Sequence, residues 1–146
     1  MHTDYTPIPG QLRAGAHTDY GVLTILKSGG PGLQAKKDEG NGPEEERWID
    51  IPFVEDAFII NIGDLMQRWT NGKWKSTLHR VLLPSPYDVK NRRQSMAFFV
   101  NINGDTYVET IETCIDDENP VKYKPVRAAD YLKMKHLASN SMGDEL

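Results

Sequence analysis

The segment from His17 to Leu26, which reads HTDYGVLTIL, constrains this chain more than any other. His17 and Asp19 are two residues apart, so their side chains point to the same side if the segment is extended. An apolar, β-branched run follows directly and is typical of a buried strand. The pair would therefore lie at the mouth of that strand, where an imidazole and a carboxylate supply two ligands of a metal site. A third ligand must come from elsewhere in the chain.

The third ligand is best sought among the other histidines, and His79 is the strongest candidate. It stands in the apolar stretch STLHRVL, which predicts a strand late in the chain, and a closing barrel would bring it against His17 and Asp19. His136 falls in a predicted C-terminal helix, on a surface or packing face. Two histidines and one carboxylate compose the facial triad of non-haem Fe(II) oxygenases, which leaves positions open for a co-substrate and O₂.

A second interpretation of the same residues stays open. His79 would then be a hydrogen-bonded core residue and His17 and Asp19 a loop pair, because a His-x-Asp with one distant histidine is a common pattern. A structural zinc site would need four protein ligands, commonly including cysteine, and Cys114 is the only cysteine. The tetrapeptide HTDY also occurs at residues 2–5, but there it precedes a turn-like TPIPG at the chain end, so we prefer the copy at 17–20.

Many short strands separated by turn signals predict a mainly β chain. We also expect two helices. A short one spans 65–70, capped by Asp64 and ended by Asn71-Gly72, and an amphipathic C-terminal one spans 127–139, as indicated by the spacing of Ala128, Tyr131, Leu132, Lys135 and Leu137. The acidic stretch 38–46 predicts a solvated hairpin loop, and Trp69 and Trp74 are expected to be packing residues. Helices are missing between most strands, which favours a barrel or double-sheet jelly roll over parallel α/β. The strands are expected over 13–19, 22–27, 33–36, 48–52, 57–62, 75–83, 95–102 and 107–111.

Length and composition indicate one globular domain over residues 1–146, with an irregular lead-in over 1–12. A net charge of −4 without a Lys/Arg cluster argues against a nucleic-acid partner. No apolar stretch approaches the roughly 20 residues that span a membrane. A single cysteine and no visible signal peptide favour the cytoplasm. The oligomeric state is not indicated.

The stretch Arg92–Phe99, RRQSMAFF, adds a site for an anion. On a strand, Arg93 and Ser95 share one face. A guanidinium beside a hydroxyl is suited to bidentate capture of a carboxylate. The alternative is that Arg93 is a surface charge or the partner of a nearby aspartate.

Taken together, these stretches resemble the 2-oxoglutarate- and Fe(II)-dependent dioxygenase superfamily, in particular its isopenicillin N synthase-like branch. The resemblance covers a motif-bearing barrel over residues 10–103. Its motifs occur in one order along the chain: GAHTDYG at 15–21, GLQ at 32–34, WIDIP at 48–52, NIGD at 61–64, RWTNG at 68–72, STLHRV at 76–81 and RQS at 93–95.

The resemblance implies a double-stranded β-helix, a jelly roll of the cupin type, and a set of site residues. His17, Asp19 and His79 would ligate Fe(II), while Arg93 and Ser95 would bind the distal carboxylate of 2-oxoglutarate. The implied activity couples oxidative decarboxylation of 2-oxoglutarate by O₂ to hydroxylation or desaturation of a small molecule, with ascorbate as a candidate reductant. The identity of the small molecule is not indicated.

Two departures from the family pattern leave alternatives open. Only sixteen residues precede His17, whereas the family carries a substantial N-terminal region, so the chain is either a fragment or a minimal member. Relatives also have an Asn-x-Tyr motif, for which this chain offers Thr3-Asp4-Tyr5, so Tyr5 is a candidate contact for 2-oxoglutarate, as is Asn61. A truncated metal-binding jelly roll without turnover, and a non-haem iron oxidase that needs no 2-oxoglutarate, are the competing hypotheses.

Overall fold

The computed structural model describes residues 11–37, 47–83 and 93–141, and the backbone divides into two compact units. Unit 1 comprises Met1–Thr18, Leu26–Ile59 and Thr77–Ala97, and unit 2 comprises Asp19–Ile25, Ile60–Ser76 and Phe98–Leu146. The expectation of a single domain stays a prediction. Tyr5, the first copy of HTDY and the expected loop over 38–46 lie outside the described residues.

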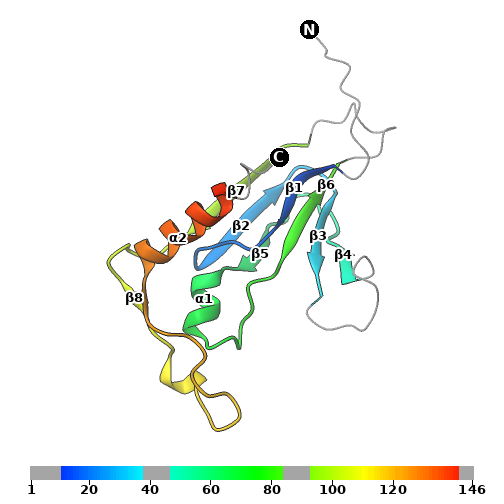
Figure 1. Cartoon of the computed structure of the whole chain (residues 1–146). Helices are drawn as coiled ribbons and strands as arrows, with labels where there is room; N and C mark the ends of the chain where they lie inside the picture. Colours follow the sequence, from blue (N-terminus) through cyan, green and yellow to red (C-terminus); the bar gives the residue numbers. More distant parts are fainter. Residues whose placement is uncertain (1–10, 38–46, 84–92, 142–146) are drawn as a thin grey trace. The chain divides into compact units, whose positions relative to one another are not determined.

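Unit 1 is built on a four-stranded antiparallel sheet in the order β1-β6-β3-β4 (Figure 1). The register sets His79 opposite His17 on one side and opposite Ala35 on the other. Segments far apart in the sequence therefore become neighbours. The strands are β1 over Leu12–His17, β6 over His79–Leu82, β3 over Leu33–Lys36 and β4 over Trp48–Asp50.

A polar ladder crosses the face of this sheet opposite to His79. Arg80 Nε donates to Gln34 Oε1 at 2.8 Å, and Gln34 Nε2 donates to Asp50 Oδ1 at 2.9 Å. The Arg80 guanidinium also lies 4.2 Å from the centroid of the Trp48 ring. Neighbouring residues of a strand point to opposite faces, so Arg80 stabilises the sheet on the side away from His79.

A second sheet has the strand order β5-β2-β7. Its central strand carries Thr24 and Ser28, which are both buried. All three strands agree with the apolar, β-branched runs in the sequence, although each begins or ends a few residues from the expected bounds. The strands are β2 over Leu23–Ser28, β5 over Ile59–Ile62 and β7 over Ser95–Val100.

Unit 2 has its own apolar core, to which both helices contribute. Leu65 of α1 and Ala128 of α2 have no exposed surface, and Tyr131 is also buried. Strands β8 and β9 form a two-stranded antiparallel sheet that leads directly into α2. No helix among the described residues is long and apolar enough to cross a membrane. The elements are α1 over Asp64–Trp69, β8 over Tyr107–Val108, β9 over Val126–Arg127 and α2 over Ala128–Ser141.

Helix α1 begins one residue earlier than expected, and Asp64 is not its cap. The N-cap is Gly63, without a side-chain capping bond, and Asp64 is the first helical residue. A Cβ on Gly63 would lie 2.3 Å from the carbonyl oxygen of Gly21, so the close approach of this backbone requires glycine. The helix ends at Trp69, one residue before the predicted end, and Asn71 and Gly72 terminate it as expected with positive φ angles of 52° and 78°.

Two expectations about packing in unit 2 are wrong. Leu137 is expected on the apolar face of the C-terminal helix, yet it is 61% exposed. Ala128 and Tyr131, which the same helical spacing includes, do pack in the core. Trp69 does pack against the core, whereas Trp74 is 57% exposed. Sequence periodicity alone places a residue on a helix face but does not say where that face stops being covered.

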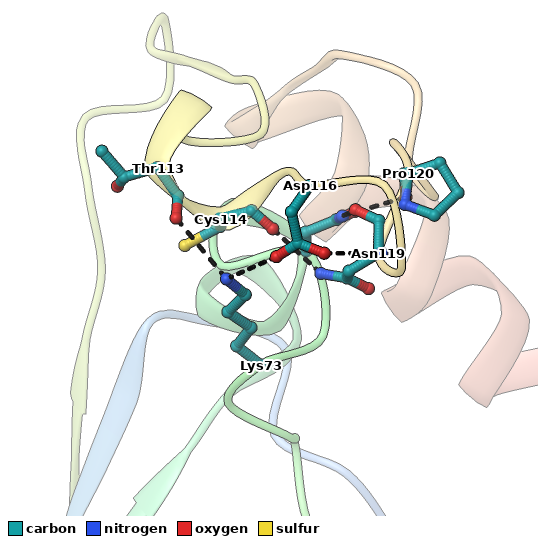
Figure 2. A network of polar contacts seen from close by, with 7 residues as sticks. Lys73, Thr113, Cys114, Asp116, Asn119 and Pro120 are labelled. Carbon is teal, nitrogen blue, oxygen red and sulfur yellow. Dashed lines mark hydrogen bonds and ion pairs between the residues drawn. The ribbon is translucent and has the colours of Figure 1, made fainter.

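An open apolar cavity lies in unit 2 between α1 and the segment after β8. Trp69, Trp74, Ile111 and Cys114 are among the residues that line it. One wall is held by polar contacts, which Figure 2 shows. Lys73 Nζ lies 3.3 Å from Asp116 Oδ2 and 3.5 Å from the carbonyl oxygen of Thr113, while Asn119 Nδ2 donates to the Cys114 carbonyl at 2.9 Å. The bond from Lys73 lowers the pKa of Asp116.

Candidate functional site

Two imidazoles meet in unit 1 because of the register between β1 and β6. His17 is the last residue of β1 and His79 the first residue of β6, and they face each other across the strand pair. Their ring centroids are 4.4 Å apart with an interplanar angle of 55°. Strand pairing thus brings together two potential metal ligands from distant parts of the sequence.

Each imidazole is oriented by a main-chain carbonyl two residues earlier. Nδ1 of His17 lies 2.7 Å from the oxygen of Gly15, and Nδ1 of His79 lies 3.0 Å from the oxygen of Thr77. A carbonyl oxygen only accepts, so these contacts place the proton of each ring on Nδ1. Nε2 is then the nitrogen that each ring can offer to a metal.

Asp19 belongs to unit 2, where it is buried and held by two side chains. Its Oδ2 accepts a hydrogen bond from Thr24 Oγ1 at 2.6 Å and another from Asn61 Nδ2 at 2.7 Å. A buried carboxylate needs such bonds because desolvation of its charge is costly. Two donors from different strands meet at one oxygen, so they fix the direction in which the carboxylate points.

The backbone after Asp19 is fixed by the start of α1. Three consecutive amide groups of the helix start donate to this segment, so the main chain around Asp19 is bound as well as its side chain. The bonds are Asp64 N to Asp19 O at 2.8 Å, Gly63 N to Val22 O at 2.9 Å and Leu65 N to Gly21 O at 3.0 Å.

His17, Asp19 and His79 compose a candidate metal-binding group among the described residues, each offering one ligand atom. They are the three residues that the sequence predicted. Two imidazole nitrogens and one carboxylate oxygen form a donor set that suits Fe(II), and fewer than four protein ligands leave coordination positions for other molecules. The residues present therefore fit an Fe(II) ion of the facial-triad type.

Arg93 forms a dense set of contacts within unit 1. Its Nε donates to the carbonyl oxygens of Gly30 at 3.2 Å and Pro31 at 3.1 Å. Its Nη2 donates to Ser28 Oγ at 2.9 Å, and its Nη1 donates to Ser95 Oγ at 3.2 Å. The hydroxyl of Ser95, the first residue of β7, lies beside Arg93, which precedes the strand.

These contacts orient the guanidinium. The bonds to described residues use Nε–H and one hydrogen on each terminal nitrogen, so within the described part of the chain one hydrogen on each terminal nitrogen is left for a carboxylate. Burial, and secondarily the charge of Arg13, lowers the pKa of Arg93. The group remains a cation at neutral pH because an arginine starts from a very high pKa.

Sequence reasoning missed two hydroxyl groups of this site. Thr24 binds the carboxylate of Asp19, and Ser28 binds Arg93. Thr24 lies within the expected strand and Ser28 directly after its expected end, so neither hydroxyl carries a sequence signal for the site; the structure shows both buried in β2. Asn61, expected to contact the co-substrate, has its amide on Asp19.

The chain matches the family model of the 2OG-Fe(II) oxygenase superfamily over residues 2–102, and it belongs to that family. The family's cofactors are Fe(II) and 2-oxoglutarate. Among curated relatives, 2-oxoglutarate-dependent dioxygenase tropC of Talaromyces stipitatus is 45% identical over 100 residues, 66% of this chain and 27% of the relative. Homoarginine-6-hydroxylase 2-ODD-233 of Oryza sativa subsp. japonica is 36% identical over 141 residues, 92% of this chain and 40% of the relative.

Solved structures of similar proteins show which fold this chain has. The chain is similar to a full-length Neurospora crassa protein in complex with alpha-KG, with a TM-score of 0.75 and 38% identity over 90% of this chain and 39% of that one. The fold is therefore the double-stranded β-helix of the family, as predicted. The chain spans between about a quarter and two fifths of the length of these relatives.

Proposed function

We propose that this chain carries the iron and 2-oxoglutarate sites of an oxygenase that hydroxylates or desaturates a small organic molecule. The observation that supports this most is the strand register that pairs His17 with His79, because it sets two imidazoles at the ends of adjacent strands. Asp19 is two residues from His17 and supplies the carboxylate of the facial triad.

Each residue has a separate task in this proposal. Nε2 of His17, Nε2 of His79 and a carboxylate oxygen of Asp19 hold the metal. Thr24 and Asn61 orient that carboxylate through their bonds to Oδ2. When bound, Fe(II) supplies the activation of O₂ that the oxidation of 2-oxoglutarate and of the small molecule requires.

The anchor for 2-oxoglutarate is Arg93, aided by Ser95. The distal carboxylate is bound through the two terminal nitrogens of the guanidinium, and the Ser95 hydroxyl accepts a hydrogen bond from Arg93 beside them. Ser28 and the carbonyls of Gly30 and Pro31 prevent the guanidinium from turning away. Tyr5 stays a candidate contact on sequence grounds alone.

A small-molecule substrate is supported by the molecules that similar proteins bind. A second solved structure of the Neurospora crassa protein holds alpha-KG and thymine. This chain is 38% identical to it over 90% of this chain and 38% of that one. We also infer a cytoplasmic location, which the single cysteine supports. Subcellular fractionation of the native host would test the location, and recovery in an oxidising compartment would contradict it.

The direct test is an anaerobic calorimetric titration with Fe(II) followed by 2-oxoglutarate, and then measurement of succinate after O₂ is admitted. We expect Arg93→Ala to weaken 2-oxoglutarate binding by about ten- to a hundredfold, because it removes a charged hydrogen-bond donor. Arg80→Ala is the matched control, since Arg80 lies on the face of the β1-β6-β3-β4 sheet opposite to His79 and binds Gln34. Equal binding by wild type and Arg93→Ala would refute the anchor.

A second candidate function is metal binding without turnover. The chain's match to only 27% of tropC and 40% of the homoarginine hydroxylase motivates it, because the greater part of each relative lies outside the match. Succinate formation well above that of His79→Ala would exclude it. Turnover that does not respond to added 2-oxoglutarate would instead indicate an oxidase without this co-substrate.

A further inference from the structure

We propose that helix α2 sets the position of Asp19 through Asp64, so that Tyr131 and Lys135 are positioning residues of the metal site. The inference rests on the proposed function, because it treats Asp19 as a ligand. It concerns residues that neither ligate the metal nor bind 2-oxoglutarate.

The first link is the carboxylate of Asp64, which is buried and bound by two residues of α2. Tyr131 Oη donates to Asp64 Oδ2 at 3.1 Å, and Lys135 Nζ lies 2.9 Å from the same oxygen. Tyr131 and Lys135 are four residues apart, so one face of the helix delivers both. A buried aspartate without such partners would be strongly disfavoured as an anion, so these contacts determine where Asp64 rests.

The second link is the backbone of the same residue. The amide of Asp64 donates to the carbonyl oxygen of Asp19 at 2.8 Å, and Ser76 Oγ approaches that carbonyl at 3.5 Å. Asp64 therefore joins α2 to Asp19 with one hydrogen bond on its main chain and two contacts on its side chain. Loss of the side-chain contacts would let the start of α1 move, and the carbonyl of Asp19 would move with it.

The third link is Tyr20, the residue after Asp19. Lys135 Nζ lies 4.9 Å from the centroid of the Tyr20 ring, and the ring of His136 meets the same ring edge-on at 5.5 Å. Cations and aromatic edges both attract a ring in these geometries. Helix α2 thus contacts both the residue that follows Asp19 and the residue that binds its carbonyl.

The charges around Asp64 support a fixed hydrogen-bond direction. Burial, and then the negative charge of Asp64, raises the pKa of Tyr131, so its hydroxyl keeps its proton and donates at neutral pH. The guanidinium of Arg68 lies 5.2 Å from the Tyr131 ring and 5.1 Å from the ring of Tyr123. The two tyrosines are therefore comparable neighbours of α1, and only Tyr131 binds Asp64 among the described contacts.

This pair of tyrosines supplies a matched test. Tyr131→Phe removes the hydroxyl bound to Asp64, whereas Tyr123→Phe removes a hydroxyl bound to Gln67 at 3.1 Å. Lys135→Met removes the second contact, and Lys135→Arg restores a cation. Each variant is titrated anaerobically with Co(II) as a spectroscopic substitute for Fe(II), and its thermal stability is measured without metal.

We expect Tyr131→Phe and Lys135→Met each to weaken Co(II) binding by about three- to tenfold and to alter the Co(II) absorption spectrum. Tyr123→Phe should leave affinity and spectrum unchanged, and Lys135→Arg should recover most of the affinity. If Tyr131→Phe does not fold, the two variants of Lys135, whose side chain is partly exposed, test the proposal by themselves.

Wild-type affinity and spectrum in Lys135→Met would overturn the proposal, and so would an equal loss in Tyr123→Phe, which would indicate a general effect on stability. These failures differ from failure of the proposed function. In that case the wild type would bind Co(II) no better than His79→Ala does.

Discussion

In unit 1 the two histidines stand at strand ends and each ring is held by a main-chain carbonyl, whereas in unit 2 the carboxylate of Asp19 is buried and held by two side chains. Main-chain carbonyls are present whatever residue occupies the position. The orientation of His17 and His79 thus depends on the fold of two strands. The orientation of Asp19 depends on the identity of Thr24 and Asn61, so it is the more vulnerable part of the candidate metal group.

The largest effect should come from removing a ligand in unit 1. His79→Ala takes away one of two imidazoles, and we expect Fe(II) affinity to fall by more than about a hundredfold, beyond the loss typical of an outer contact. Anaerobic titration measures this, with Gln34→Ala, on the face of the sheet opposite to His79, as the control. Affinity within twofold of wild type would show that His79 is no ligand.

Next in size is a packing change in unit 2. Gly63→Ala would place a Cβ 2.3 Å from the carbonyl oxygen of Gly21, and we expect a loss of about 1–3 kcal/mol in the free energy of unfolding. Gly15→Ala is the matched substitution in unit 1, because a Cβ there meets nothing within 4 Å. Urea denaturation compares the two. Equal stabilities would mean that the backbone approach at Gly63 is not as tight as described.

The dependence of Asp19 on side chains can be tested at Thr24. Thr24→Val keeps the shape but removes the hydroxyl bound to the carboxylate, and we expect about tenfold weaker metal binding. Thr70→Val is the control, since Thr70 is also buried but donates to the Met66 carbonyl at 3.0 Å. Should both variants bind metal alike, the contrast between the two units would be lost.

A smaller effect is expected at the carboxylate anchor. Ser28→Ala removes one acceptor of Arg93 and should weaken 2-oxoglutarate binding by roughly two- to tenfold, the value of one ordinary hydrogen bond, without changing metal affinity. Ser95→Ala is the companion variant, because its hydroxyl also binds Arg93. A loss of metal affinity in either variant would contradict the separation of anchor and metal ligands.

The smallest effect concerns alkaline pH. Tyr131 has a pKa above the ordinary value of 10.0 because it is buried and lies beside Asp64. The unfolded chain therefore releases this proton first, and the contribution to stability is present below pH 10 and is lost as pH rises further. Unfolding free energies measured across that range should fall less steeply in Tyr131→Phe than in wild type. If the unfolding free energies of wild type and Tyr131→Phe fell equally with pH, the pKa of Tyr131 would not be raised by folding.

Strand positions and the three candidate ligands could be predicted because they depend on local patterns. Alternation links His17 to Asp19 and Arg93 to Ser95, and the apolar stretch around His79 predicts the strand that carries it. The sequence suggested that His79 lies near His17, but it could not establish that the two residues pair, since strand register is a property of the folded sheet. Ordered motifs typical of one family supplied what spacing alone left open.

Contacts between distant segments explain what could not be predicted. Thr24 is a single hydroxyl in an apolar run and Ser28 follows that run, and nothing local indicates that one binds Asp19 and the other Arg93. Asp64 reads as a helix cap, but the approach of Gly63 to Gly21 gives the cap position to glycine.

The only cysteine of the chain lines the apolar cavity of unit 2 together with Trp69 and Trp74. A thiol-reactive fluorophore would therefore attach at one place in each molecule, close to two of the three tryptophans, while Trp48 lies in unit 1. Energy transfer from Trp69 and Trp74 to a dye on Cys114 would therefore report by fluorescence whether unit 2 is folded. The variants of α2 could then be followed in real time during unfolding, with neither the metal nor the co-substrate present.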